Sequence, residues 1–390
     1  MKKIGLLLSL LLVVSTLSGQ TITLSPQAEI SVITCGPGQD ELYLAFGHSA
    51  IRVVDPAHRI DYAYNYGVFD FDQPNFYLNY TKGLLLFKLG VYSYPDFVNS
   101  YVYYNRWVTE QVLNLSPAQK QAVFNFLEWN ALPENETYRY DYFYNNCASK
   151  IRDVLAQNLG DSLRFDTTFI QTSYTIRQLT DLCLAYQPWG DLGIDICLGL
   201  PMDKKASPYE YMFLPDYVMQ FMDHATIIRN SVAEPLVKKK IPVYMSLPKE
   251  IPKASVHPFT AFGLFGALVL VLTIVDIRRK KLTLWFDVIL FLVTGLVGFL
   301  LLLLWLATDH QAAAKNFNIL WAMPTHLLIV GAFFKRFRPV VKKYFLGVAV
   351  LSVALAAGWT LLPQQMNIFL LPLVGAIALR SWAVSKYLPD

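Results

Sequence analysis

Residues 48–65, HSAIRVVDPAHRIDYAYN, have the pattern of a strand, a turn and a second strand. Alternating β-branched and aromatic residues flank a turn that contains proline, which is typical of an antiparallel hairpin. If the turn is centred between Pro56 and Ala57, positions whose numbers sum to 113 face each other across the ladder. His48 then lies opposite Asn65 with both side chains on one face of the sheet. A change of one residue in the register of the turn would remove this pairing.

A second segment predicts a helix that begins with a cysteine. Cys147–Leu159, CASKIRDVLAQNL, carries apolar residues at helical spacing, with Asn146 before it as N-cap and Gly160 after it as a stop. The unpaired N–H groups and the positive end of the helix dipole favour a thiolate at Cys147. A cysteine nucleophile needs a histidine base and a polar residue that orients it. The alternative is that Cys147 is a small buried apolar residue and His48 a structural one.

The composition points to a membrane protein. Of the 390 residues, 54% are hydrophobic and only 16% are charged, whereas soluble domains carry about 25% charged residues. This excludes a disordered chain and a purely cytosolic globular protein. Residues 258–390 hold 12 Lys and Arg against 4 Asp and Glu, which leaves 21 against 25 in residues 1–257. No strongly basic face is present, so we expect no binding of nucleic acid.

The first residues resemble a secretory signal. MKK precedes an apolar stretch at residues 4–14, and small residues follow up to Gly19. The apolar stretch is shorter than the ~20 residues that a span needs. We therefore expect a signal peptide at residues 1–19, with an uncleaved anchor as the alternative. No cysteine lies at the junction, which argues against a lipoprotein.

The chain becomes membrane-like after His257. Apolar stretches predict five spans at about residues 259–276, 284–308, 317–334, 344–362 and 366–385, the last with Arg380 snorkelling toward the interface. Basic residues gather between the first and second spans and between the third and fourth, which places both loops in the cytoplasm. We therefore expect an extracytoplasmic domain at residues 20–256, a membrane domain at 257–390 and a cytoplasmic C-terminus.

The four cysteines lie in the outward domain, where disulfides can form. Cys183 and Cys197 could form a disulfide or remain free, and the sequence leaves both possibilities open. No two cysteines have the CxxC spacing of metal ligands. No P-loop, dinucleotide-binding fingerprint or nucleophile elbow of serine hydrolases is present. We therefore expect no metal and no cofactor.

The order of these motifs carries a resemblance. A histidine strand, a polar residue on the next strand and a cysteine that opens a helix are similar to the circularly permuted papain-like fold of the lecithin:retinol acyltransferase group, which is related to NlpC-type cysteine peptidases. More closely, CGPGQDELYLAFGHSAIRV, YRYDYFYNNCASKIRDVL and WLATDHQAAAKNFNILWAMP resemble the Lnb family of bacterial lipoprotein N-acyltransferases. The resemblance covers nearly the whole mature chain. It implies an α+β permuted papain-like periplasmic domain, followed by an all-α domain of five transmembrane helices in the inner membrane.

The resemblance also implies a reaction. Cys147 would accept an acyl chain from a glycerophospholipid as a thioester and pass it to the α-amino group of a diacylglyceryl lipoprotein. His48 would be the general base and acid, and Asn65 would orient it. The related enzymes often have a second histidine in this third position; here only His58 is near, in the predicted turn, so Asp61 is the second candidate. The alternatives are a membrane-anchored cell-wall cysteine peptidase or amidase, and a non-enzymatic assembly factor.

Several other residues are candidates for binding the substrates. Arg52 could bind an anionic headgroup or be an ordinary surface residue of a strand. Tyr142 precedes the nucleophile and could line the site. A polar patch near the second and third spans could hold a lipid headgroup or the lipoprotein amine, or could simply cap helices at the interface: Asp309, His310, Asn316 and Asn318. His326 lies within a predicted span and is a candidate because ionisable groups are costly there.

Overall fold

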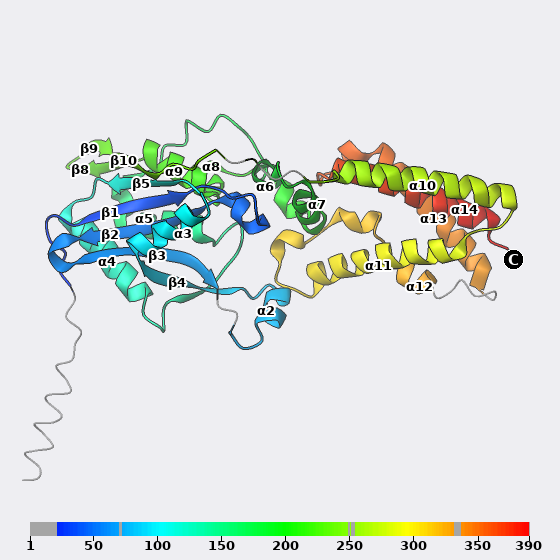
Figure 1. Cartoon of the computed structure of the whole chain (residues 1–390), viewed down its shortest axis with the longest axis horizontal. Helices are drawn as coiled ribbons and strands as arrows, with labels where there is room; N and C mark the ends of the chain where they lie inside the picture. Colours follow the sequence, from blue (N-terminus) through cyan, green and yellow to red (C-terminus); the bar gives the residue numbers. More distant parts are fainter. Residues whose placement is uncertain (1–21, 70–71, 249, 251–253, 331–336, 390) are drawn as a thin grey trace, which may run out of the picture.

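The computed structural model describes residues 22–69, 72–248, 250, 254–330 and 337–389. The expected signal peptide, residues 1–19, lies outside the described residues. The chain forms two parts that follow one another along its long axis (Figure 1). The first is an α+β domain built on a large sheet, and the second is a bundle of long helices.

The large sheet of the α+β domain has seven strands, and every neighbouring pair is antiparallel. Its spatial order is β10 (Val237–Tyr244), β5 (Val108–Leu113), β1 (Glu29–Cys35), β2 (His48–Asp55), β3 (Ile60–Phe69), β4 (Leu86–Ser93) and β6 (Thr137–Arg139). A small second sheet contains β7 (Leu163–Arg164), β8 (Thr226–Arg229) and β9 (Val232–Pro235).

Helices cover both faces of the large sheet. Because side chains of a strand alternate between faces, Ile51 and Val53 join the main core with α5 (Cys147–Leu159), whereas Ala50 joins a smaller core with α3 (Tyr94–Tyr103). The main core also includes α4 (Pro117–Asn130) and α9 (Pro215–His224). The remaining helices of this domain are α2 (Phe76–Lys82), α6 (Ile176–Leu184), α7 (Pro188–Cys197) and α8 (Pro208–Tyr211).

The hairpin of β2 and β3 forms as predicted, but its register differs. Asp55 pairs with Ile60 and Ile51 with Tyr64, so partner numbers sum to 115 instead of 113. The turn is longer than expected because Pro56–His58 form a 3-10 turn and Arg59 closes it in the left-handed conformation. The pairing ends at Ile51 and Tyr64, and the same register continued to His48 displaces Asn65 by two residues from the opposite position, which keeps both side chains on the same face.

The helix predicted at Cys147–Leu159 is confirmed with its boundaries. The Asn146 side chain accepts a hydrogen bond from the N–H of Ser149, and the Ser149 hydroxyl accepts one from the N–H of Asn146. This reciprocal pair satisfies free donors at the start of α5. Gly160 follows the last helical residue. Cys147 is thereby fixed as the first residue of a well-capped helix.

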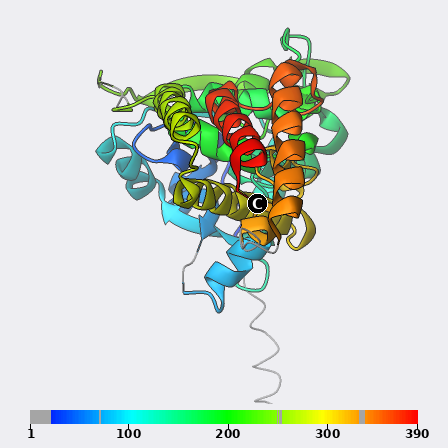
Figure 2. The same cartoon turned by 90° about the vertical axis from the view of Figure 1, so that its right-hand side faces the viewer.

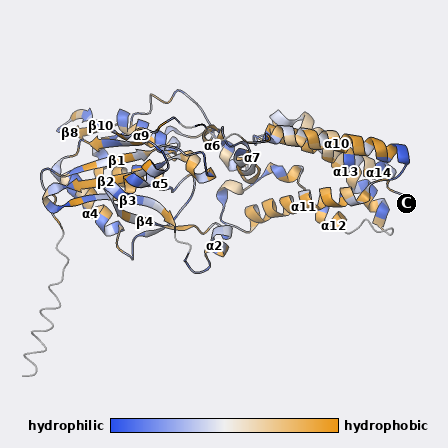
Figure 3. Cartoon of the chain, in the orientation of Figure 1, coloured by the Kyte–Doolittle hydropathy of each residue, from blue (hydrophilic) through white to orange (hydrophobic). Residues whose placement is uncertain are grey.

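Four segments of the second part are long and apolar enough to cross a membrane. They are α10 (Pro258–Arg279), α11 (Leu284–Leu306), α13 (Arg338–Ala357) and the segment Ile368–Tyr387, which contains α14 (Leu371–Tyr387). Apolar residues dominate these helices, and hydrophilic residues mark the end of α10 that lies farthest from the sheet (Figure 3). Seen from that end, α14 lies between α10 and α13 (Figure 2).

The third expected span, residues 317–334, is not a continuous helix in the part of the chain that the structure describes. Phe317–Leu320 form a 3-10 helix, a turn follows, and the described part of α12 is His326–Val330. Pro324 precedes α12, and proline is tolerated at a helix start but not within one. Residues 331–334 lie outside the described residues.

The sequence suggested that Arg380 snorkels toward the membrane surface, and this expectation is wrong. Its side chain is fully buried and forms ion pairs with Asp287 at 2.7 Å and Asp276 at 2.9 Å. Its guanidinium also donates to the hydroxyl of Thr273 at 3.1 Å. The physical reason is that the carboxylates of α10 and α11 neutralise the charge of the guanidinium inside the bundle. The side chain of Arg380 is therefore stable there without contact with water.

The two parts are joined by hydrogen bonds between α7 and the segment that follows α11. The amides of Asn316 and Asn318 donate to backbone carbonyls at the end of α7, including that of Ile196 at 2.7 and 3.3 Å. The N–H of Gly199 donates to the carbonyl of Ala312 at 2.7 Å. Carbonyls at a helix end have no partner within the helix, so these bonds fix the sheet domain on the helical bundle.

Candidate functional site

The site lies where β2 and α5 both begin. Nε2 of His48 lies 2.5 Å from Oδ1 of Asn65, so this ring nitrogen carries a hydrogen and donates it. The sulfur of Cys147 lies beside the same imidazole, and the charge and hydrogen bonding of each group act on the pKa of the other. The sulfur further accepts hydrogen bonds from the backbone N–H groups of Ser49 and Ala148. The structure therefore brings together the three residues that the sequence singled out.

The two titratable groups of this site change each other's pKa. Burial raises the pKa of the Cys147 thiol, but the charge and hydrogen bond of His48 and the two backbone donors outweigh burial and bring it below the ordinary value. Burial lowers the pKa of His48, but the charge of the sulfur and the hydrogen bonds to Cys147 and Asn65 raise it above the ordinary value. Both directions favour a thiolate and imidazolium pair, which is the reactive form of a cysteine nucleophile.

Gly67 keeps the space beside the sulfur open. It lies at an irregularity of the β3–β4 ladder and has a φ of +92°, which favours glycine. A Cβ at this position would lie 3.5 Å from the Cβ of Cys147 and 3.7 Å from the ring of Tyr140. Because Gly67 has no side chain, nothing lies between Cys147 and the ring of Tyr140 at this position.

Three residues near His48 were not found by sequence reasoning. The ring of Tyr101, from α3, stacks on the imidazole with centroids 6.3 Å apart. Tyr101 hydrogen-bonds to the buried thiol of Cys35, the register partner of His48. The guanidinium of Arg106 lies 4.8 Å from the Tyr101 ring centroid, and its Nε donates to the carbonyl of Gly36. A strand pairing of Cys35 with His48 depends on the β1–β2 register, for which the sequence carries no local signal.

Arg52 and Asp61 bind each other rather than the candidate nucleophile or its histidine. The Arg52 guanidinium donates to Asp61 at 2.7 Å and to Glu110 at 3.0 Å, and it lies 3.7 Å from the ring centroid of Tyr94. Its donors are thus engaged within the sheet and α3. Asn65 occupies the position beside His48 for which Asp61 was the second candidate.

The residues of the expected polar patch separate into two pairs. Asp309 forms an ion pair with Arg139 at 2.9 Å, and His310 contacts the carbonyl of Tyr80 at 3.2 Å, so both lie beside α2. Asn316 and Asn318 are buried and hold the end of α7 as described above. Tyr142 belongs with the first pair, because its hydroxyl lies 2.6 Å from that of Tyr80.

His326 lies inside the helical bundle. Its side chain is fully buried, and its Nδ1 lies 2.7 Å from the hydroxyl of Tyr344. The ring also packs against Phe291 and Phe345. These contacts place it among the aromatic residues that join α11, α12 and α13.

The described cysteines are free thiols, so Cys183 and Cys197 are not joined in this structure. One group of carboxylates in the described chain has the spacing of a metal site: Asp181, Asp191 and Asp195 offer oxygen atoms within 4.8 Å of one another. Burial raises the pKa of Asp181 to about 8 and that of Asp191 to about 6. Asp195 is already bound by Arg177 and by Asn367.

The fold and the site together define a two-part membrane protein with a candidate cysteine site. An α+β domain with a cysteine–histidine–asparagine site stands on a bundle of apolar helices. Residues 22–181 match the family model described as the Lnb N-terminal periplasmic domain, and residues 250–388 match the Lnb transmembrane domain.

The chain belongs to the Lnb family. This confirms the resemblance to the Lnb family seen in the sequence, and a periplasmic domain joined to a membrane domain fits a protein of the inner membrane. Neither the curated proteins nor the solved structures include a significant match.

Proposed function

We propose that the protein is a lipoprotein N-acyltransferase that uses Cys147 as its nucleophile. The observation that carries this proposal is the contact of Cys147 with His48, which is itself bonded to Asn65, in a chain of the Lnb family. The donor is a glycerophospholipid of the membrane. The acceptor is the α-amino group of the lipid-modified N-terminal cysteine of a lipoprotein.

In the first half of the reaction, the Cys147 thiolate attacks an ester carbonyl of the phospholipid. A carbon–sulfur bond forms, and the ester carbon–oxygen bond breaks. The imidazolium of His48 gives its proton to the departing oxygen, so a lysophospholipid leaves and His48 becomes neutral. Asn65 holds the imidazole ring in one orientation through both proton transfers.

In the second half, the lipoprotein amine attacks the thioester carbonyl. Neutral His48 takes the proton of the amine as the carbon–nitrogen bond forms and the carbon–sulfur bond breaks. The products are an amide-linked acyl chain and the original thiolate and imidazolium pair. Both substrates are anchored in the same membrane, so holding the site on a membrane bundle raises their effective concentration.

The fold supports two finer proposals. Along the chain, the strand that carries His48 comes first, the strand that carries Asn65 comes second, and the helix that begins with Cys147 packs on the sheet. This order supports a permuted papain-like arrangement for the periplasmic domain. Five membrane crossings are supported by the contacts at the two ends of the segment between α11 and α13. Asn318 contacts α7 near the sheet domain, whereas Arg338 donates to the carbonyl of Pro389 at the opposite end. Five crossings would leave the C-terminus in the cytoplasm.

The test uses a strain that lacks other lipoprotein N-acylating enzymes. The wild-type chain, Cys147→Ala and Cys147→Ser are expressed at equal levels, and lipoprotein N-termini are analysed by mass spectrometry. We expect the additional acyl chain only with the wild-type protein. Unchanged acylation with Cys147→Ala would overturn the proposal. Cleavage of cell-wall peptides without acylation by the wild-type protein would favour the peptidase alternative instead.

A further inference from the structure

The short helix α2 is fixed to the outer end of a transmembrane helix. The N–H of Asp309, which follows α11, donates to the carbonyl of Lys82 at 2.8 Å. His310 contacts the carbonyl of Tyr80 at 3.2 Å. Gly83 ends α2, and a Cβ there would lie 2.9 Å from the backbone N of His310 and 3.0 Å from the carbonyl carbon of Asp309. The two backbones touch with no room for a side chain, so α2 cannot leave the end of α11 without losing these contacts.

The length of α11 sets the depth of α2 in the membrane. Its 23 residues rise ~34 Å at about 1.5 Å per residue, and the hydrocarbon core of a bilayer is about 30 Å thick. α11 is therefore long enough to cross the hydrocarbon, and its last residue, Leu306, lies at the end that faces the periplasmic domain. Asp309 is the third residue after Leu306 and binds α2 directly through its backbone N–H. This places α2 at the level of the lipid headgroups.

The outer face of α2 has the composition of a membrane-interface element. Tyr77 is 76% exposed and Leu78 is 52% exposed, and Lys82 is exposed at the end of the helix. The end of α11 adds Trp305 and Leu306, of which the latter is 68% exposed. Exposed aromatic and aliphatic side chains next to a basic residue are typical of segments that lie in the interfacial region.

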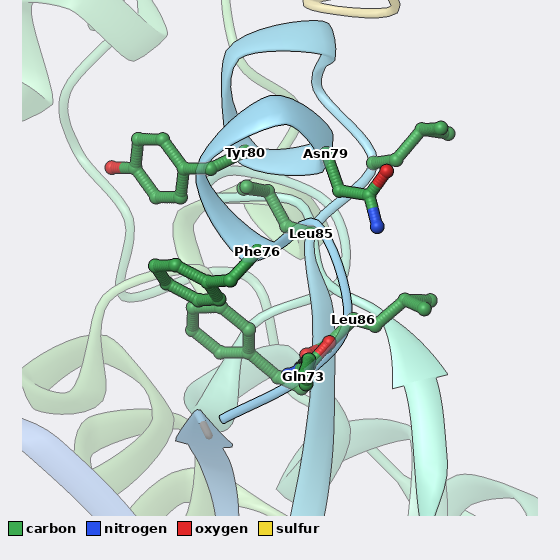
Figure 4. Close-up of a pocket in the computed structure, with 8 residues that line it drawn as sticks. Gln73, Phe76, Asn79, Tyr80, Leu85 and Leu86 are labelled. Atoms are coloured by element: carbon green, nitrogen blue, oxygen red, sulfur yellow. Dashed lines mark hydrogen bonds between the residues drawn. The ribbon is translucent and has the colours of Figure 1, made fainter. Parts of the chain in front are cut away.

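The opposite face of α2 is seated on the start of β4. Figure 4 shows Phe76 directed from α2 toward this strand, with Leu85 beside it, whereas the Leu86 side chain points away. The amide of Gln73 donates to the carbonyl of Leu86 at 2.8 Å, which secures the segment before the helix. The hollow between these residues measures only about 10 Å³, roughly the room that one water needs. Because this side of α2 is packed on the protein, the exposed side with Tyr77 and Leu78 is the one that can contact lipid.

A row of aromatic residues leads from α2 to the thiol. The hydroxyl of Tyr80 lies 2.6 Å from that of Tyr142, and the ring of Tyr142 lies 5.5 Å from that of Tyr140. Tyr140 and Cys147 both border the open position at Gly67. The three residues that link α2 to the nucleophile are thus aromatic rings, whose apolar faces suit an acyl chain better than a charged group.

We propose that α2 lies in the headgroup region of the outer leaflet and forms the entrance through which the acyl chain of the donor phospholipid reaches Cys147, along Tyr80, Tyr142 and Tyr140. The membrane contact of α2 rests on its own geometry. The role of α2 as an entrance for an acyl donor rests on the proposed function.

The membrane contact is tested by photo-crosslinking of the full chain. Tyr77 is replaced by p-benzoylphenylalanine, and the protein is placed in vesicles of phosphatidylethanolamine and phosphatidylglycerol. The control position is Val232 of β9, which is 59% exposed and lies at the end of the molecule opposite the helical bundle (Figure 1). We expect phospholipid adducts at position 77 and none at position 232. Equal yields at both positions, or no adduct at 77, would overturn the placement of α2.

The entrance is tested by acyl transfer from two donors. Tyr77→Asp and Leu78→Asp place charges on an exposed face, with Val232→Asp as the matched control. With a long-chain phospholipid in vesicles, we expect KM to rise roughly tenfold and kcat to change little. With a short-chain phospholipid dissolved in water, we expect no change. Equal losses with both donors would show that α2 has only a structural role and would overturn the entrance.

The two tests separate this inference from the proposed function. The adduct at position 77 does not require acyl transfer, so it is also measured in the Cys147→Ala variant. If the wild-type protein transfers no acyl chain, the proposed function and the entrance fail together, while the membrane contact is still decided by the crosslink.

Discussion

The side chains of His48 and Asn65 are joined by a hydrogen bond of 2.5 Å although the two residues are not register partners. The paired part of β2 and β3 ends at Ile51 and Tyr64, and its register, continued to His48, leads to the position two residues beyond Asn65. The contact is therefore diagonal, and diagonal neighbours on one face of a sheet are within reach of long side chains. Because Asn65 accepts the hydrogen on Nε2, the imidazole is held in one orientation beside Cys147.

This relationship predicts a change in the pH profile of the Asn65→Ala variant. The pKa of Cys147 is lowered and that of His48 is raised, so the thiolate and the imidazolium exist together only between the two pKa values. The profile of kcat/KM against pH is then bell-shaped, and its basic limb lies at the pKa of His48. The hydrogen bond to Asn65 raises that pKa, so its removal moves the basic limb to lower pH. We also expect kcat/KM at the optimum to fall about ten- to a hundredfold because the ring loses its orientation.

The matched control is Asn65→Asp, which keeps an acceptor and adds a negative charge beside the imidazolium. It should move the basic limb to higher pH. A basic limb that stays in place in both variants would show that His48 is not the group that titrates there.

Arg380 should be essential for the stability of the membrane domain. Arg380→Met leaves Asp276 and Asp287 buried without a counter-charge, and breaking a buried ion pair in this way costs about 3–5 kcal/mol. We expect a clear fall in the Tm of the protein in detergent. The triple variant Arg380→Met, Asp276→Asn and Asp287→Asn should recover most of the loss. An unchanged Tm in the single variant would contradict the buried ion-pair cluster.

Gly199 should be required for the docking of the periplasmic domain on the bundle. A Cβ at this position would lie 1.9 Å from the carbonyl oxygen of Ala314, so Gly199→Ala must displace backbone at the junction. We expect a lower Tm, faster proteolysis at the junction and reduced acyl transfer.

The control for this prediction is Gly193→Ala in the middle of α7, where a Cβ meets nothing within 4 Å. Alanine is favoured over glycine in a helix by about 1 kcal/mol, so this variant should be at least as stable as the wild type. A Gly199→Ala variant that behaves like Gly193→Ala would show that the close approach at the junction is not needed.

Local patterns in the sequence predicted the parts of the fold that depend on local physics. The hairpin, the capped helix at Cys147 and four of the apolar helices follow from side-chain periodicity, N-cap chemistry and hydropathy. These features need only neighbouring residues to be specified. The meeting of Cys147 and His48 was expected from their order and from the family resemblance.

The remaining features depend on contacts between distant segments. The register of the hairpin was missed because a left-handed Arg59 lengthens the turn, and nothing in DPAHR requires that conformation. The partners of Arg380 come from two other helices, so its burial could not be read from its own segment. The asparagines at 316 and 318 have the polarity of a binding patch, but their role as caps of α7 appears only when the two domains meet.

The central claim is that Cys147 carries an acyl chain during the reaction. The most direct measurement is intact-protein and peptide mass spectrometry of the full chain, incubated with a phospholipid of known acyl composition in the absence of any lipoprotein acceptor. The account predicts a fatty acyl group on Cys147 that hydroxylamine removes and that disappears when the lipoprotein is added. It further predicts no acyl group in Cys147→Ala. An acyl group on another residue, or transfer to the lipoprotein that persists in Cys147→Ala, would contradict it.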